Sequence, residues 1–132
     1  MPTPFSFTKL VVHDLEGMSA YYQRAYGLKE FERIQAEIEG DAIDEIFLGI
    51  DAAHGPGTLT LLQFPTRPAP TPGAIILGFV TDDLEALVAA VEAAGGTVRE
   101  GIRESEAAPV RVAFTVDPEG NLAENVQVIG AV

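Results

Sequence analysis

Glu124 occupies a position where a carboxylate needs an explanation. The segment 117–121, Asp-Pro-Glu-Gly-Asn, combines an early proline with a glycine that tolerates positive φ, which is typical of a tight turn between two strands. On the strand that leaves this turn, a period of two places Glu124 on one face with Leu122, Val126 and Val128. A carboxylate on an apolar face must find a partner, bind a metal, become neutral or line a cavity that admits water or a ligand.

The two histidines are also side chains that bind metals readily. His13 follows a predicted strand and precedes a helix cap, so we expect it to be a turn or capping residue. His54 lies in the loop 54–57, and this position makes it a weak candidate ligand. The sequence leaves open whether either histidine contributes to a site.

A group of acidic residues surrounds the predicted turn at Gly40. Their spacing is not that of a calcium-binding loop, and we expect them to lie on a solvated hairpin. The group consists of Glu37, Glu39, Asp41, Asp44 and Glu45.

Composition limits the classes of protein that need to be considered. The chain has 132 residues, of which 47% are hydrophobic, and this is enough for a core. It has no cysteine, which excludes disulfides and thiolate chemistry. A net charge of −12 opposes binding to nucleic acid. The longest apolar run, 74–80, is too short to span a bilayer and the N-terminus lacks a signal-like segment, so we expect a cytoplasmic protein without a membrane partner.

The first half of the chain predicts one helix and four strands. Asp14 is a helix cap, and apolar residues recur at helical spacing as far as Gly27, where the helix should end. Runs of β-forming residues and turn signals predict the strands at residues 5–12, 28–39, 43–50 and 58–64.

A proline-rich segment, 65–72, separates the two halves and is expected to be a linker, because each proline removes a backbone donor. The same order of elements follows it. A strand is predicted at 74–80 and a helix at 83–94, and further strands at 97–104, 110–116 and 122–129.

The two halves form an internal repeat. An offset of 69 residues aligns Asp14-Leu15-Glu16 with Asp83-Leu84-Glu85, and Gly27 with Gly96. Each half reads βαβββ and is too small to bury its apolar face alone. We therefore expect a single α+β domain over 1–132, with one module at about 1–65 and the other at about 73–132.

These features resemble the vicinal oxygen chelate superfamily, which includes glyoxalase I, bleomycin resistance proteins, extradiol dioxygenases and methylmalonyl-CoA epimerase. The resemblance rests on the two βαβββ modules, the Val-x-Asp-Leu-Glu signature at 12–16, and the turn 117–121 followed by Glu124. It covers nearly the whole chain, and it implies a fold with a concave β-sheet cleft. It does not identify a function, because the superfamily contains both enzymes and binding proteins.

The resemblance also implies where a metal would bind in related proteins. Their ligands come from the first and last strands of each module, and the corresponding positions here are Phe7, about Leu61, Ile76 and Glu124. Only Glu124 keeps a ligand type. Since one carboxylate is too few for a transition metal, we expect neither a metal nor another cofactor.

The same positions predict the lining of the cleft. If Phe7, Leu61, Ile76 and Glu124 face it, then Lys9 and Gln63 share that face by alternation. The result is an apolar site with a few polar groups, which suits a small organic ligand. Lys9 is expected to pair with Glu124, either as a structural ion pair or as an acid–base couple.

Two functions remain. The first is a binding protein similar to the bleomycin resistance branch, which sequesters an organic ligand in a metal-free cleft. The second is a metal-independent lyase or isomerase in which Glu124 is the general acid or base. A metal-dependent glyoxalase or dioxygenase is a distant third. We also expect a homodimer, because relatives commonly dimerise and exposed sheet edges need covering.

The absence of ligand types at three of the four positions leads to a first prediction. Protein purified without chelator should contain far less than one zinc, nickel, iron or manganese ion per chain, because a single carboxylate does not retain these ions against water. Elemental analysis by mass spectrometry measures this directly. A metal content near one ion per chain would contradict the prediction.

Overall fold

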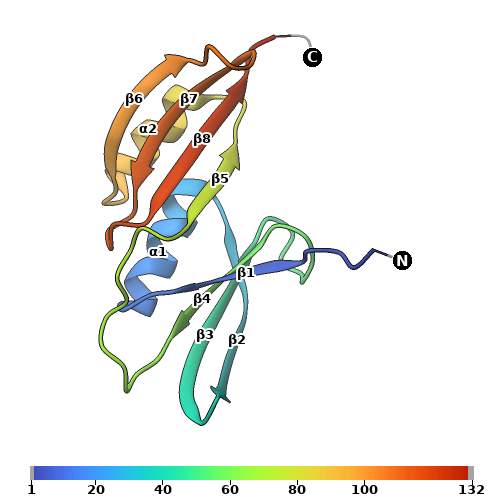
Figure 1. Ribbon diagram of the computed structural model, residues 1–132, viewed down its shortest axis with the longest axis vertical. Coiled ribbons are helices and arrows are strands. Elements are labelled where there is room, and N and C mark those ends of the chain that lie inside the picture. The colour runs from blue at the N-terminus through green and yellow to red at the C-terminus, as the bar shows by residue number, and fades with distance from the viewer. Residues whose placement is uncertain (1, 131–132) are drawn as a thin grey trace. The chain divides into compact units, whose positions relative to one another are not determined.

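A computed structural model describes residues 2–130 and gives an α+β fold (Figure 1). The predicted order of elements is confirmed over the described residues. The elements are β1 (Phe7–Val11), α1 (Leu15–Tyr26), β2 (Lys29–Ile38), β3 (Asp41–Gly49), β4 (Thr58–Gln63), β5 (Ile76–Val80), α2 (Leu84–Ala93), β6 (Thr97–Glu104), β7 (Val110–Val116) and β8 (Leu122–Val128).

Element boundaries differ from the predicted ones mainly at strand starts. β1 begins at Phe7 rather than residue 5, and β5 begins at Ile76 rather than residue 74. Phe5 is 82% exposed, so its β-forming character brings no sheet contacts. β3 begins earlier than predicted, because Asp41 already pairs with Ile38 across the hairpin.

The chain divides into two compact units. The first comprises residues up to Gln23 together with Gly27–Pro70, and the second comprises Arg24–Tyr26 together with the residues from Thr71 onward. The last turn of α1 is therefore part of the second unit. Among the described residues, no helix has the length and apolar character needed to cross a membrane.

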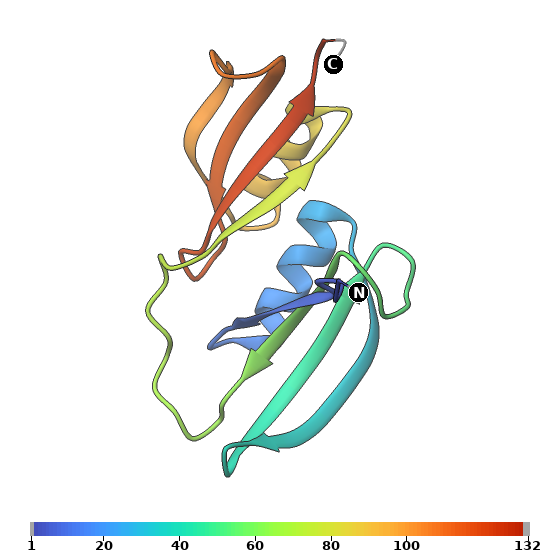
Figure 2. The ribbon, with the colours of Figure 1, turned by 45° about the vertical axis from the view of Figure 1, so that its right-hand side comes forward.

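Each unit contains one four-stranded sheet, and the two sheets have the same topology, which confirms the predicted repeat. The strand orders are β1-β4-β3-β2 and β5-β8-β7-β6. In each sheet the first strand pairs in parallel with the last, and the remaining pairs are antiparallel. Both β1 and β5 are edge strands of their sheets, as Figure 2 shows.

Both helices begin at the predicted caps. The Asp14 carboxylate accepts a hydrogen bond from Gly17 N at 3.0 Å, and Asp83 accepts one from Ala86 N at the same distance. α1 ends at Gly27, whose φ of +71° is a left-handed conformation that glycine adopts at little cost.

Buried apolar side chains lie on both faces of the first sheet, with Ile43, Phe47 and Leu62 on one face and the larger share of the core on the other. On that other face, Leu10, Ile46 and Leu61 occupy neighbouring strands and are at most 4% exposed. On α1, Met18 and Tyr22 are 1% exposed, as expected for the buried stripe of an amphipathic helix.

The second unit has a buried polar residue in its core. Asn125 is fully buried on the face of the second sheet opposite Glu124, and its amide donates to Ala113 O and Thr115 Oγ1. Its carbonyl oxygen accepts a hydrogen bond from Tyr26 Oη at 2.8 Å. The Tyr26 ring stacks on Phe79, with ring centroids 3.7 Å apart. The burial of this amide is tolerated because its donors and acceptor are satisfied.

The turn between β7 and β8 is organised by Asp117, which is 5% exposed. Its carboxylate accepts hydrogen bonds from the backbone N of Glu119 and Asn121 and from the Asn121 side chain, each at 2.9 Å. Gly120 has a φ of +90°, which a residue with a β-carbon adopts only with strain. The side chain and the glycine together fix the predicted tight turn.

A second prediction follows for this turn. Asp117→Ala should lower the free energy of unfolding by about 2 to 4 kcal/mol, because three donors lose a charged, buried acceptor. Urea denaturation measures the change. Asp82→Ala is the matched control, since Asp82 is exposed and one residue from a helix cap. Equal stabilities of the two variants would contradict this account of the turn.

Candidate functional site

The candidate site is the face of each sheet that does not carry the helix-packed core, which we call the helix-free face. Registers in the first sheet place Lys9 beside Thr60 and Thr60 beside Phe47, so these three share the helix-free face. Leu10 and Leu61 point to the other face. The helix-free face of the first sheet carries Phe7, Lys9, Val11, Glu32, Ile34, Ala36, Ile43, Glu45, Phe47, Thr58, Thr60 and Leu62.

The predicted facing of Leu61 and Gln63 is wrong. Leu61 is fully buried in the core opposite the helix-free face. Gln63 lies on that same core side and donates to His13 O at 2.6 Å. A shift of one residue moves every side chain of a strand to the other face, and the prediction was off by one residue here. The residue of β4 that shares a face with Phe7 and Lys9 is Thr60.

Lys9 pairs with Glu45, not with Glu124 as predicted. Lys9 Nζ lies 2.6 Å from Glu45 Oε1, and the two side chains are 35% and 4% exposed. The expectation that Glu45 is solvated is therefore also wrong. The alternation of Ile43, Glu45 and Phe47 predicts this burial, because it places the carboxylate between two large apolar side chains on one face.

Thr60 is at the centre of the helix-free face and has an unusual environment. The residue is fully buried, and its Oγ1 has no hydrogen-bond partner within residues 2–130. Its neighbours on the two adjacent strands are Lys9 and Phe47. An unpaired buried hydroxyl costs free energy relative to an apolar side chain of the same shape, so this position is not optimised for stability alone.

An aromatic cluster closes one end of this face. The His54 ring contacts Phe31 and Phe47 edge to face, with both centroid distances at 5.0 Å. His54 Nε2 also contacts Glu32 Oε1. The loop that carries His54 is held by Thr58, whose Oγ1 donates to Gly55 O at 2.8 Å. His54 therefore lies at the site despite its loop position.

A small groove lies at the opposite end. It has a volume of about 360 Å³ and is formed by the end of β1 and the proline-rich segment, including Val11, Phe64 and Arg67. The Arg67 guanidinium stacks on the Phe64 ring, 3.8 Å from its centroid, and also bonds to Asp41 at 2.8 Å. The predicted linker therefore forms a wall of this groove.

The second sheet presents a more exposed helix-free face. Ile76 and Glu124 lie on it together, since the registers pair Ile76 with Leu122 and Gly78 with Glu124. Ile76 is 58% and Val80 78% exposed. Glu124 is exposed and has no hydrogen bond or ion pair with the part of the chain that the structure describes. The predicted grouping of Glu124 with apolar neighbours on its strand is thus correct.

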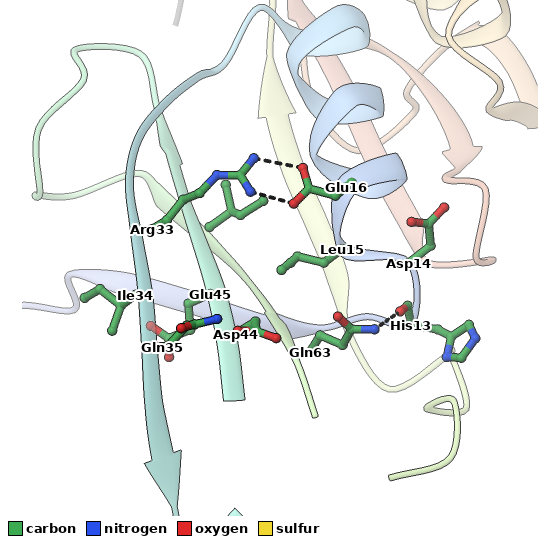
Figure 3. Close-up of a pocket in the computed structure, with 11 residues that line it drawn as sticks. His13, Asp14, Leu15, Glu16, Arg33, Ile34, Gln35, Asp44, Glu45 and Gln63 are labelled. Carbon is green, nitrogen blue, oxygen red and sulfur yellow. Dashed lines mark hydrogen bonds and ion pairs between the residues drawn. The ribbon is translucent and has the colours of Figure 1, made fainter. Parts of the chain in front are cut away.

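A larger groove of about 630 Å³ lies on the core side of the first sheet, next to the start of α1 (Figure 3). Arg33 bonds to both oxygens of Glu16, at 2.5 and 2.8 Å, and to Glu30 at 2.7 Å. These contacts lower the pKa of Glu16 and raise that of Arg33. Arg33 and Glu16 at this groove thus pair with each other, and Glu45 of the helix-free face also contributes to its lining.

The second unit has an equivalent cluster next to α2. Arg111 bonds to both oxygens of Glu85 at 2.6 Å and to Gln127 at 2.8 Å. The bonds from Arg111 lower the pKa of Glu85 to about 2. Asp44 is the register partner of Gln63 in the first sheet, just as Arg111 is the register partner of Gln127 in the second sheet. The groove beside α1 is therefore lined by an aspartate at the place where the second unit has an arginine.

The residues at the implied metal positions do not fit a divalent metal. Phe7 and Ile76 have no donor atoms, and Thr60 and Glu124 supply one hydroxyl and one carboxylate. Nowhere in residues 2–130 do three histidine or acidic side chains converge in a group that could hold a metal ion. The donor set is too small for the three or four ligands that transition metals need.

Comparisons with known proteins agree with this architecture. The model of the Glyoxalase/Bleomycin resistance protein/Dioxygenase superfamily matches residues 5–124. The comparison with curated proteins gave no match.

Solved structures with the same fold include two proteins that the match covers almost completely. A glyoxalase family protein from Bacillus cereus has a TM-score of 0.81 at 16% identity, with 98% of this chain and 97% of that chain covered. A glyoxalase/bleomycin resistance protein/dioxygenase family enzyme from Burkholderia phytofirmans PsJN has a TM-score of 0.73 at 24% identity, covering 94% and 98%.

A glyoxalase I mutant from Zea mays is also similar, with a TM-score of 0.78 at 22% identity. The match covers 96% of this chain but only 47% of the maize protein. At these identities the likeness shows the fold alone.

A third prediction concerns the Lys9–Glu45 pair. Lys9→Met should lower the free energy of unfolding by about 2 kcal/mol, because it leaves the buried Glu45 carboxylate without its cation. This value is below that for a fully buried pair, since Lys9 is partly solvated. The double variant Lys9→Met/Glu45→Leu should recover most of the loss, because an apolar pair replaces a buried ion pair at little cost.

Arg103→Met is the control, since Arg103 and Glu100 are 3.7 Å apart and more than half exposed. Its effect should be below about 0.5 kcal/mol. A Lys9→Met variant that is as stable as this control in urea denaturation would show that the pair contributes nothing.

Proposed function

Since the chain belongs to the glyoxalase/bleomycin resistance protein/dioxygenase superfamily, we propose that it binds a small organic molecule on the helix-free faces of its sheets without a metal. Family membership alone does not decide between binding and catalysis. The proposal rests on the chemistry of these faces, which are apolar with isolated polar groups, as ligand sites commonly are.

Exposed apolar side chains are the observation that carries this proposal. Phe7 is 52%, Ile76 58% and Val80 78% exposed, and all three lie on helix-free faces. Large apolar side chains left in water mark binding surfaces, and each unit carries at least one of them on its own helix-free face. Sequestration of an organic ligand is the function that needs nothing more than this surface.

Catalysis by Glu124 is the second candidate. Its carboxylate is exposed beside apolar residues and has no partner within residues 2–130, so it is available to a bound molecule. Such a carboxylate accepts or returns a proton when a substrate places a C–H or O–H group within hydrogen-bond reach. The proposal assigns Glu124 to ligand contact in either case.

A homodimer remains part of the proposal. β1 and β5 are edge strands, and each carries an exposed apolar residue, Phe7 and Ile76. Strand edges of this kind favour pairing with another chain unless they are covered. Light scattering at micromolar concentration distinguishes a dimer from the 14.0 kDa monomer.

The fourth prediction tests ligand binding directly. Ligand-observed NMR with a chemically diverse set of small organic molecules should find binders. In protein spectra recorded with these binders, the backbone amides whose chemical shifts change should lie on the helix-free faces. For binders on the second sheet, Glu124→Gln should change the affinity severalfold and alter stability by less than about 0.5 kcal/mol, because Glu124 is exposed.

Glu92→Gln, an exposed change on α2, is the matched control and should change neither quantity. If the protein converts one of the bound molecules, loss of this conversion in Glu124→Gln with the affinity retained would favour catalysis over sequestration. A set in which nothing binds, or in which all binders map to the groove beside α1, would overturn the proposed function.

A further inference from the structure

The helix-free face of the first sheet holds unused hydrogen-bonding capacity at its centre. Thr60 Oγ1 is buried and unpaired. The Lys9 ammonium has three protons, and the structure gives it one acceptor within residues 2–130, Glu45 Oε1. The Glu45 carboxylate accepts only this one bond within the same residues. Donors and an acceptor are therefore available within one small area.

The charge of this area is balanced. Lys9 and Glu45 neutralise each other at 2.6 Å, and the chain as a whole has a net charge of −12. An anionic ligand would meet the Glu45 carboxylate and the repulsion of the whole protein. A cationic ligand would meet the Lys9 ammonium and could not accept from it. An uncharged ligand with both an acceptor and a donor suits the pair best.

The surroundings of these groups favour a flat apolar ligand body. Phe7 lies close to the pair, with Lys9 Nζ 5.9 Å from its ring centroid. Phe47 is next to Thr60 on the neighbouring strand, and Val11 is two residues along β1 from Lys9. Aromatic rings pack well against such side chains.

From these observations we propose that this face selects an uncharged ring compound in which a carbonyl oxygen and an N–H or O–H group lie side by side. The carbonyl oxygen accepts from Lys9 and Thr60, and the N–H or O–H group donates to Glu45. This inference rests on the proposed function, because it names the ligand class of the same kind of surface.

Lys9 is the side chain that admits the ligand to Thr60. Phe47, the other neighbour of Thr60, contacts the His54 ring and is 7% exposed. Lys9 is 35% exposed and has a flexible four-carbon stem, so it can change rotamer. In this proposal a change of the Lys9 rotamer exposes the hydroxyl while the ammonium stays near Glu45.

Three probes of equal shape test the ligand class. Benzamide carries a carbonyl oxygen beside an N–H group, benzoate carries two anionic acceptors, and benzamidinium carries donors only. Amide chemical-shift titrations with each probe should show benzamide bound at β1, β3 and β4. Benzoate and benzamidinium should bind at least about tenfold more weakly, because benzoate places a negative charge against Glu45 and benzamidinium places a positive charge against Lys9.

Thr60→Val tests the assigned hydroxyl with a side chain of equal shape. The variant should weaken benzamide binding by about fivefold, the effect of one lost hydrogen bond. It should keep or raise the melting temperature, since it removes an unpaired buried polar group. Thr8→Val is the matched control, because Thr8 precedes Lys9 on β1 and faces the other side of the sheet.

Three results obtained with a probe that binds would overturn the inference. These are benzoate or benzamidinium binding as tightly as benzamide, Thr60→Val leaving benzamide affinity unchanged, and a lower melting temperature in Thr60→Val than in Thr8→Val. Failure of all three probes, while other molecules from the diverse set bind the helix-free faces, would overturn this inference and leave the proposed function standing. Failure of the probes and the diverse set together would overturn both.

Discussion

One short helix covers only one face of a four-stranded sheet, and this constraint shapes the whole protein. In the first unit, Leu10, Ile46 and Leu61 form the core on one face, and each strand must then direct its alternate residues away from that core. The other face has no helix to bury it. Its side chains therefore have to be stabilised by one another, by loops or by something that binds, and this is why polar groups and apolar groups are mixed there.

The Lys9–Glu45 pair shows how such a face is stabilised at a cost. Burying a carboxylate to 4% exposure is expensive, and a nearby cation recovers only part of that free energy. An apolar residue at position 45 would serve folding at least as well. Thr60 beside it adds an unsatisfied hydroxyl. Departures from a purely apolar face that do not improve stability are typical of positions kept for function.

Sequence patterns predicted the fold well because its determinants are local. The caps Asp14 and Asp83, the turn 117–121 and the strand alternation each depend on neighbouring residues. The site was predicted less well. Facing in β4 depends on register with β1, which brings Leu10 beside Leu61, and no local signal fixes it. Glu45 is predicted to lie on a solvated hairpin because it belongs to an acidic group around a turn without calcium-loop spacing, although its own alternation indicates burial.

The repeat also has an asymmetry that limits how the chain can be divided. The second unit includes Arg24–Tyr26, which precede the proline-rich segment by about forty residues in sequence. Tyr26 provides the donor for the buried carbonyl of Asn125, and its ring covers Phe79. A fragment that begins after the proline-rich segment would lack both. The second half therefore relies on Tyr26 of the first half to satisfy a buried amide, so the boundary between the two repeats is not a boundary between two self-sufficient pieces.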